Sequence, residues 1–175
     1  MAGFKLQEDY ENVMEFTMGD IVPEKLLQQQ EAFDACHTLA EMTDEQKLHM
    51  DRMLRDAADP LPIEFPVGYD RYDQDLSAML EEKGEVKAVI LISNTDSWIS
   101  VDFAYAIFHT AFVTLVSFIY QWATMMLMDD QRILVPILSW KGEEIVRKLV
   151  PTAHRQKLWL ATRDYEIKRE ISWQI

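Results

Sequence analysis

The feature that most constrains this fold is a long apolar run over residues 103–128, in which His109 and Gln121 are the only strongly polar residues. A segment of this kind must be buried in protein or in lipid. Two buried arrangements are open: one long helix over the whole run, or a helix at 100–109, a strand at 112–120 and a second helix to the end of the run. The β-branched composition of 112–120 favours the second arrangement.

A third interpretation makes the run a membrane-spanning helix, and the protein a membrane-anchored complex subunit held through residues 103–128. Acidic residues flank the run, Asp102 before it and Asp129 and Asp130 after it, where membrane helices favour basic anchors. The mean hydropathy of −0.16 is typical of a water-soluble chain. These observations weigh against a membrane partner, although the run alone leaves all three interpretations open.

Three other segments predict strands. Residues 86–92 are rich in β-branched side chains, and residues 132–138 share this character, although Pro136 restricts that strand to an edge or a bulge. From residue 164 to residue 175 apolar and polar residues alternate, which is the two-residue period of a strand. This terminal strand could complete the sheet of the chain or extend the edge of a neighbour, so Trp173 is a candidate binding residue.

Helices are predicted in the first half of the chain. Apolar residues within 24–42 fall on one stripe, and a second helix follows from 43 to 58. Thr43 and Gln46 have the spacing of a capping box, which marks the start of that second helix. Because almost no loop separates the two segments, they predict a helical hairpin. A further short helix is predicted over 72–83, ended by the glycine that follows it.

These patterns together predict an α+β or α/β fold. The N-terminal helical hairpin would pack on a mixed sheet, with a long apolar central helix or helix–strand unit and a C-terminal antiparallel strand. We expect a single domain over residues 1–175, made of an acidic helical part (1–59), a proline-rich connection (60–71) and an α/β core part (72–175).

The negative charge lies in the first half of the chain. Of the net charge of −13, residues 1–85 contribute −14, from 21 acidic and 7 basic residues, and residues 86–175 contribute +1. A chain this acidic is poorly suited to nucleic-acid phosphates, so we expect protein partners, among them basic ones. The single cysteine, Cys36, cannot form an internal disulfide, which predicts a reducing compartment: the cytoplasm, or an assembled virion.

An acidic cluster formed by Asp70, Asp73 and Asp75 is a candidate binding site. Its spacing does not fit a calcium loop, because the glycine and the bidentate glutamate of such a loop are missing. Capping of a helix by Asp70 or Asp73 is the structural alternative.

Acidic residues and histidines also recur along the predicted hairpin, at Asp34, His37, Glu41, Glu45 and His49. Asp34 and His37 have the spacing of half of a di-iron motif, but the second half does not occur. We therefore expect no metal and no cofactor.

The segment after the strand at 86–92 carries the only pattern that indicates catalysis. In α/β proteins ligands bind at the carboxyl ends of strands, which is where residues 93–102 would lie. Trp98 and Asp102 are spaced as in TIR domains, which this segment resembles. Asp96 and Asp102 are spaced as in nucleoside deoxyribosyltransferases, to which it is also similar. In both families an acid acts at an N-glycosidic bond, so the resemblance implies Asp102 as the catalytic acid, with Asp96 and Trp98 beside it. The structural alternative is that Asp96 or Ser100 caps the following helix and that Asp102 lies in its first turn.

Outside that segment we find no catalytic motif: no glycine-rich phosphate loop, no Gly-x-Ser-x-Gly and no Cys-x-x-Cys. Ten methionines and five tryptophans are a large number for this length, and both residue types adapt well to interfaces. Trp122, Met125, Met126 and Met128 form one soft apolar group. We therefore expect a non-enzymatic protein-binding subunit of a larger intracellular or virion-type assembly, or an acidic inhibitor of a basic protein. In either case we expect a homo- or hetero-oligomer.

Overall fold

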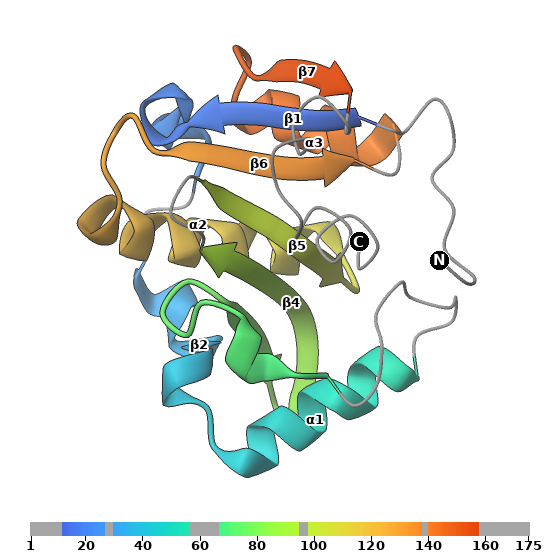
Figure 1. The fold of residues 1–175 in the computed structure, drawn as a ribbon. Helices are drawn as coiled ribbons and strands as arrows, with labels where there is room; N and C mark the ends of the chain where they lie inside the picture. The colour runs from blue at the N-terminus through green and yellow to red at the C-terminus, as the bar shows by residue number, and fades with distance from the viewer. Residues whose placement is uncertain (1–11, 27–29, 57–66, 95–97, 138–139, 158–175) are drawn as a thin grey trace.

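The computed structural model describes residues 12–26, 30–56, 67–94, 98–137 and 140–157. Across these residues a single mixed sheet runs through the molecule in the order β2-β3-β4-β5-β6-β1-β7 (Figure 1). The strands are β1 (Asn12–Thr17), β2 (Cys36–Thr38), β3 (Ala78–Glu82), β4 (Glu85–Asn94), β5 (Ile99–Ala106), β6 (Arg132–Ile137) and β7 (His154–Lys157). The α-helices are α1 (Asp44–Arg55), α2 (His109–Met126) and α3 (Trp140–Leu149). Short 3-10 turns join them: η2 (Met18–Asp20), η3 (Pro23–Lys25), η4 (Gln30–Ala35), η5 (Leu39–Glu41) and η6 (Tyr69–Arg71).

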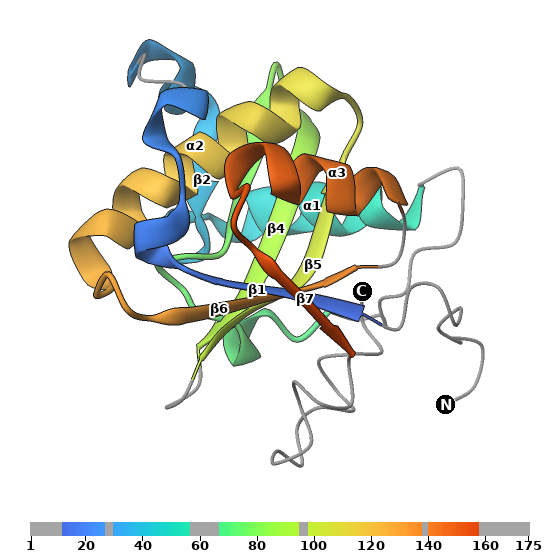
Figure 2. The same cartoon turned by 90° about the horizontal axis from the view of Figure 1, so that it is seen from above.

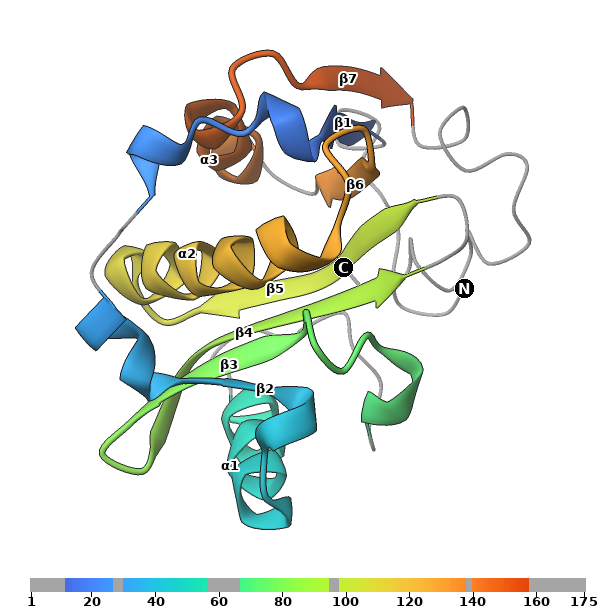
Figure 3. The ribbon, with the colours of Figure 1, turned by 90° about the vertical axis from the view of Figure 1, so that its left-hand side faces the viewer.

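Helices cover both faces of the sheet. Helix α1 packs on one face, and α2 lies on the other (Figure 3). Helix α3 is on the same side as α2, and the two helices lie over different strands (Figure 2). The sheet therefore separates two apolar cores, a larger one under α2 and α3 and a smaller one under α1.

The pairing of β5 with β6 is the one parallel contact among the described strands, and it is short. Only Ile99 with Ile133 and Ser100 with Leu134 are in register, whereas β1 pairs with β6 along six residues. Beyond these two pairs β5 and β6 diverge (Figure 1). The two strands meet at their amino ends and leave the rest of their facing edges unpaired with each other.

The predicted N-terminal helical hairpin is wrong. The described residues within 24–42 form η3, η4, β2 and η5 instead of an α-helix, and α1 is the one α-helix that the structure describes between residues 12 and 56. Cys36 and Thr38 are buried, and His37 between them is partly exposed, which is the two-residue alternation of a strand. This strand, β2, pairs with β3. Pairing with the sheet therefore overrides the helical spacing of the apolar residues.

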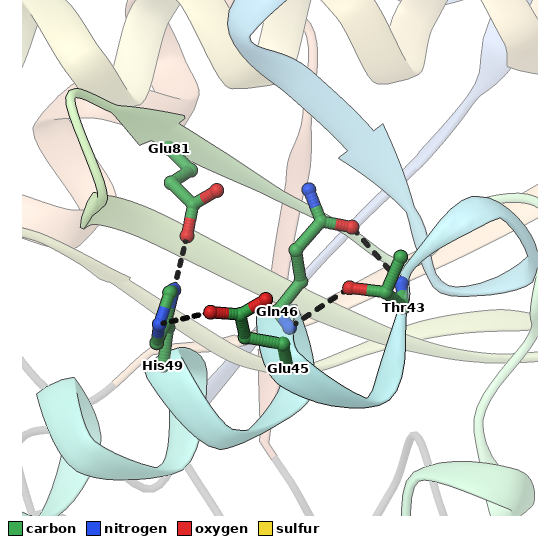
Figure 4. Close-up of polar contacts among 5 residues, drawn as sticks. All are labelled: Thr43, Glu45, Gln46, His49 and Glu81. Atoms are coloured by element: carbon green, nitrogen blue, oxygen red, sulfur yellow. Dashed lines mark hydrogen bonds and ion pairs between the residues drawn. The ribbon is translucent and has the colours of Figure 1, made fainter.

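The start of α1 is confirmed at the capping box. The backbone N–H of Gln46 donates to Thr43 Oγ1 at 3.1 Å, and the backbone N–H of Thr43 donates to Gln46 Oε1 at 2.9 Å (Figure 4). These two bonds satisfy N–H groups that have no partner inside the helix.

The short helix predicted over 72–83 is also wrong. Its second half is β3, which forms a hairpin with β4. Lys83 and Gly84 both have positive φ, 54° and 79°, as a two-residue hairpin turn requires. Gly84 thus lies in the turn of the β3–β4 hairpin and does not end a helix.

Both buried arrangements predicted for residues 103–128 are wrong, since the run begins as a strand and continues as one helix. The beginning of the run belongs to β5, where Phe103 and Tyr105 pack toward α1, and the helix begins only at His109. The predicted strand at 112–120 is the middle of α2. In it the hydroxyl of Ser117 donates to the backbone carbonyl of Val113 at 2.7 Å, so this polar group is satisfied within the helix.

Among the described residues we find no helix with both the length and the apolar character needed to cross a membrane. Residues 103–128 do not form one helix, because the run is divided between β5 and α2.

The strands predicted at 86–92 and 132–138 are confirmed as β4 and β6. Pro136 pairs with Val13 of β1 and lies beyond the two pairs that join β6 to β5, so its missing N–H costs no bond to β5. The predicted terminal strand at 164–175, with Trp173, and residues 60–66 of the proline-rich connection lie outside the described residues.

The capping box gives a direct test of how α1 is held. Thr43→Ala removes the acceptor for the Gln46 N–H, and we expect it to lower the free energy of unfolding by about 1 kcal/mol. Thr43→Ser keeps the acceptor and should change that free energy by only a few tenths of that amount. Urea unfolding followed by circular dichroism measures both, and equal losses would show that the cap does not hold the helix.

Candidate functional site

A bulge in β5 places Asp102 on the face of the sheet covered by α1. Val101 pairs with Ile92 and Phe103 pairs with Leu91, which leaves Asp102 as an extra residue between the two pairs. Bulges of this kind redirect a side chain and are frequent beside functional sites. The Asp102 carboxylate accepts a hydrogen bond from the hydroxyl of Ser93 in β4.

Burial sets the chemistry of this carboxyl. Asp102 is 2% exposed, and burial raises its pKa from 3.8 to about 6. The hydroxyls of Ser93 and Ser100 and the positive charge of Arg71 favour the charged form and limit the rise. The carboxyl can therefore gain or lose a proton near neutral pH, which is a property of catalytic acids.

An arginine and a tyrosine lie near this carboxyl. The Arg71 guanidinium donates to the hydroxyl of Tyr72 at 3.1 Å and lies 5.2 Å from the centroid of its ring. Burial raises the pKa of Tyr72, and the charge of Asp102 adds to the rise. The cluster thus combines the Tyr72 hydroxyl, the Asp102 carboxyl and the Arg71 guanidinium. Because Asp102 is only 2% exposed, a substrate could not reach this carboxyl in this structure.

The structure describes two of the three residues predicted to act at a glycosidic bond, Trp98 and Asp102, and both are buried. Trp98 is 1% exposed, with the Arg132 guanidinium 5.5 Å from the centroid of its ring, and Asp96 lies outside the described residues. The predicted helix with Asp102 in its first turn is wrong, because β5 occupies that position and runs antiparallel to β4. Asp102 is therefore a mid-strand residue rather than one at the carboxyl end of a parallel strand.

The predicted acidic cluster serves the local turn. Asp73 Oδ1 accepts from the backbone N–H groups of Asp75 and Leu76, both at 2.9 Å, and its Oδ2 accepts from Asn94 at 3.1 Å. Asp70 and Asp75 are exposed. The carboxylate of Asp73 thus stabilises the turn before β3 rather than capping a helix, because residues 67–77 form no α-helix.

The histidines and acids of the predicted hairpin are dispersed among different elements. His49 lies between two glutamates, 2.8 Å from Glu81 of β3 and 3.8 Å from Glu45 one turn earlier in α1 (Figure 4). This contact ties α1 to the sheet. Among the residues that the structure describes, no three His, Cys, Asp or Glu side chains come together as metal ligands would.

A groove lies between α2 and the segment from η4 to η5, on the α2 side of the sheet. Its volume is about 450 Å³. Its lining, which we call the groove residues, consists of Phe33, Asp34, Cys36, His37, Glu41, Phe118, Gln121, Trp122 and Met125.

Aromatic rings build the floor of this groove. Phe33 and Phe118 meet edge to face with centroids 5.9 Å apart, and Phe118 and Trp122 do so at 6.4 Å. Met125 continues this row along α2 and is 70% exposed. The floor is thus a rigid aromatic row that ends in a flexible, exposed methionine.

The rim of the groove is acidic. Asp34 and Glu41 are both exposed, and the groove residues include no lysine or arginine. The last turn of α2 also lacks a basic residue, so the negative end of its dipole is not neutralised there. Burial raises the pKa of the Cys36 thiol to about 12, and the charge of Glu82 adds to the rise, so this cysteine offers no thiolate to the groove.

Two of the groove residues, Trp122 and Met125, belong to the soft apolar group that the sequence predicts. The three methionines of this group are exposed, Met125 and Met126 at the end of α2 and Met128 just beyond it. Phe33 was missed as a partner of Phe118, because it comes from a segment predicted to be a separate helix. No local pattern in residues 33–41 reveals this contact, because it joins segments far apart in the sequence.

Comparison with known proteins does not place the chain in a family. No family model matches it, and no curated protein does. One solved structure, a GCN5-related N-acetyltransferase from Kribbella flavida, is similar with a TM-score of 0.43 and 13% sequence identity. The match covers 83% of this chain and 36% of that one, and it establishes no shared activity.

The raised pKa of Asp102 predicts an unusual pH dependence of stability. The folded state holds the Asp102 proton more tightly than the unfolded state does. The free energy of unfolding therefore falls by about 3 kcal/mol as the pH rises from 3.8 to about 6, and it is constant above that pH. Asp102→Asn cannot titrate. We therefore expect its free energy of unfolding to increase relative to the parent through that pH window, as measured by urea unfolding at several pH values.

Ser93→Ala provides the second arm of this test. It removes a donor that favours the charged carboxylate, so the upper end of the window should move above pH 6. A stability difference between the parent and Asp102→Asn that does not change with pH would contradict this account of Asp102.

Proposed function

We propose that this protein works by binding another protein, and that the groove beside α2 receives a basic segment of that partner carrying apolar side chains. The observation that carries the proposal is the combination of an aromatic floor with an exposed Met125 and an acidic rim. Such a protein acts as a subunit of a larger assembly or as an acidic inhibitor of a basic partner.

The floor supports an apolar anchor. A single exposed methionine is normal on a protein surface, but Met125 adjoins a hollow that two phenylalanines and a tryptophan already line. Tryptophan is enriched among the residues that dominate binding energy, and methionine repacks around varied side chains. The volume of about 450 Å³ suits a few side chains of a partner rather than a flat domain surface.

The rim supports a cationic partner. Asp34 and Glu41 lie beside the apolar floor, and Asp129 and Asp130 are exposed just beyond the end of α2. Opposite charges at the rim of an interface raise the association rate and select the partner, more than they raise affinity. The excess of acidic residues in the first half of the chain also favours a cationic partner.

A synthetic amphipathic peptide tests the proposal. Its leucines recur every three or four positions and lysines fill the others, and a matched peptide carries glutamate in place of lysine. We expect the lysine peptide to bind with micromolar affinity by fluorescence anisotropy, to bind more weakly as salt increases, and to outcompete the glutamate peptide.

Variants locate the binding. Met125→Gln removes the apolar anchor and should weaken binding by about tenfold, whereas Leu48→Gln, at a 62% exposed position of α1, should leave it unchanged. Asp34→Lys should weaken binding and reduce its salt dependence, and Asp75→Lys is its control outside the groove. The proposal fails if neither peptide binds, or if the groove variants and their controls have equal effects.

A further inference from the structure

A second hollow lies on the other flank of α2, lined by residues of the sheet, α2 and α3. We call it the cavity; its volume is about 180 Å³. Its lining is apolar and includes Val101, Ala104, Phe112, Val116, Val135 and Leu149.

The divergence of β5 from β6 gives this cavity its opening. Val101 and Ala104 of β5 and Val135 of β6 line it at positions beyond the two pairs that join the strands. Ala104 lines the cavity and is also exposed, so it marks the mouth. Ala104 and Ala123 are small, which leaves space that larger residues would fill.

The size and lining select an apolar occupant. Water needs polar partners inside a cavity, and apolar cavities of about 150 Å³ remain dry and bind molecules such as benzene. A dry void also lacks the dispersion contacts that an apolar ligand would restore. At about 180 Å³ this cavity is slightly larger than that, which suits one aliphatic chain of medium length.

An adjoining hollow of about 320 Å³ supplies positive charge. It shares Leu26, Phe112 and Leu149 with the cavity, and its lining adds His109 and Lys148. Lys148 Nζ lies 4.0 Å from Glu144, and about two thirds of each side chain is exposed, so this ion pair is weak and the ammonium can bind another anion.

We propose that the cavity binds a free medium-chain aliphatic carboxylate, whose chain occupies the apolar space and whose carboxylate faces Lys148 and His109. This proposal is independent of the proposed function, because it concerns the opposite flank of α2. The volume of the cavity admits one medium-length chain, which favours a free carboxylate over the paired, longer acyl chains of a membrane lipid.

A chain-length series tests the proposal with the unaltered full-length protein. Isothermal titration with butanoate, hexanoate, octanoate and decanoate, each below its micelle concentration, should show affinity rising about fourfold per methylene and then levelling off once the cavity is full. Octylamine should bind about tenfold more weakly than octanoate, because its head carries the wrong charge. Vesicles of anionic phospholipid should not sediment the protein.

Variants assign the site. Ala104→Phe places a ring at the mouth from an exposed position and should weaken octanoate binding at least tenfold, whereas Ala40→Phe, at an exposed position outside the cavity lining, should not. Lys148→Gln should weaken octanoate binding but leave octanol binding unchanged, with Lys47→Gln of α1 as its control. Circular dichroism verifies that each variant is folded.

The proposal is overturned if millimolar octanoate gives no binding heat, if affinity does not depend on chain length, or if octylamine and octanoate bind equally. Protein that sediments with vesicles but does not bind octanoate would also overturn it, in favour of a lipid surface. Because the chain-length series needs no substitution, a variant that fails to fold does not remove the test.

Discussion

Helix α2 is apolar around most of its circumference, and a sheet can cover only one side of it. Ala111, Leu115, Ile119 and Ala123 recur every four residues and are buried in the larger core. The remaining apolar residues must contact something else, and the fold places a different hollow against each flank. Phe112 and Val116 line the cavity under α3, while Phe118, Trp122 and Met125 line the groove beside η4. Both proposed sites thus follow from the same excess of apolar surface on one helix.

The short parallel contact between β5 and β6 is the second constraint. Antiparallel pairing on both sides gives a continuous sheet from β2 to β5 and another from β6 to β7, and only two register pairs join them. The bulge at Asp102 lies in β5 close to this junction. The junction therefore opens the cavity on the α2 side, and the bulge brings a buried carboxyl to the α1 side. A closed, regular sheet would provide neither feature.

The sequence predicted local features better than distant contacts. The capping box at Thr43 and the β-branched strands β4 and β6 depend on neighbouring residues, and the structure confirms them. The helical stripe at 24–42 and the β-branched residues of α2 were misread, because pairing with the sheet and burial against it outweigh local preference. The sequence places Trp122 and Met125 of the groove in one apolar group, but the contact of Phe33 with Phe118 joins distant segments that no local period reports.

The central claim is that the two flanks of α2 are separate binding surfaces, and two methionine methyl groups report on them. Met125 lies in the groove and is exposed, whereas Met18 lines the cavity and is buried. In methyl NMR spectra of the full chain labelled at methionine, the lysine peptide should shift the signal of Met125 and leave that of Met18 in place. Octanoate should do the reverse. If each ligand shifted both signals equally, or neither ligand shifted its own, the account of α2 would be contradicted.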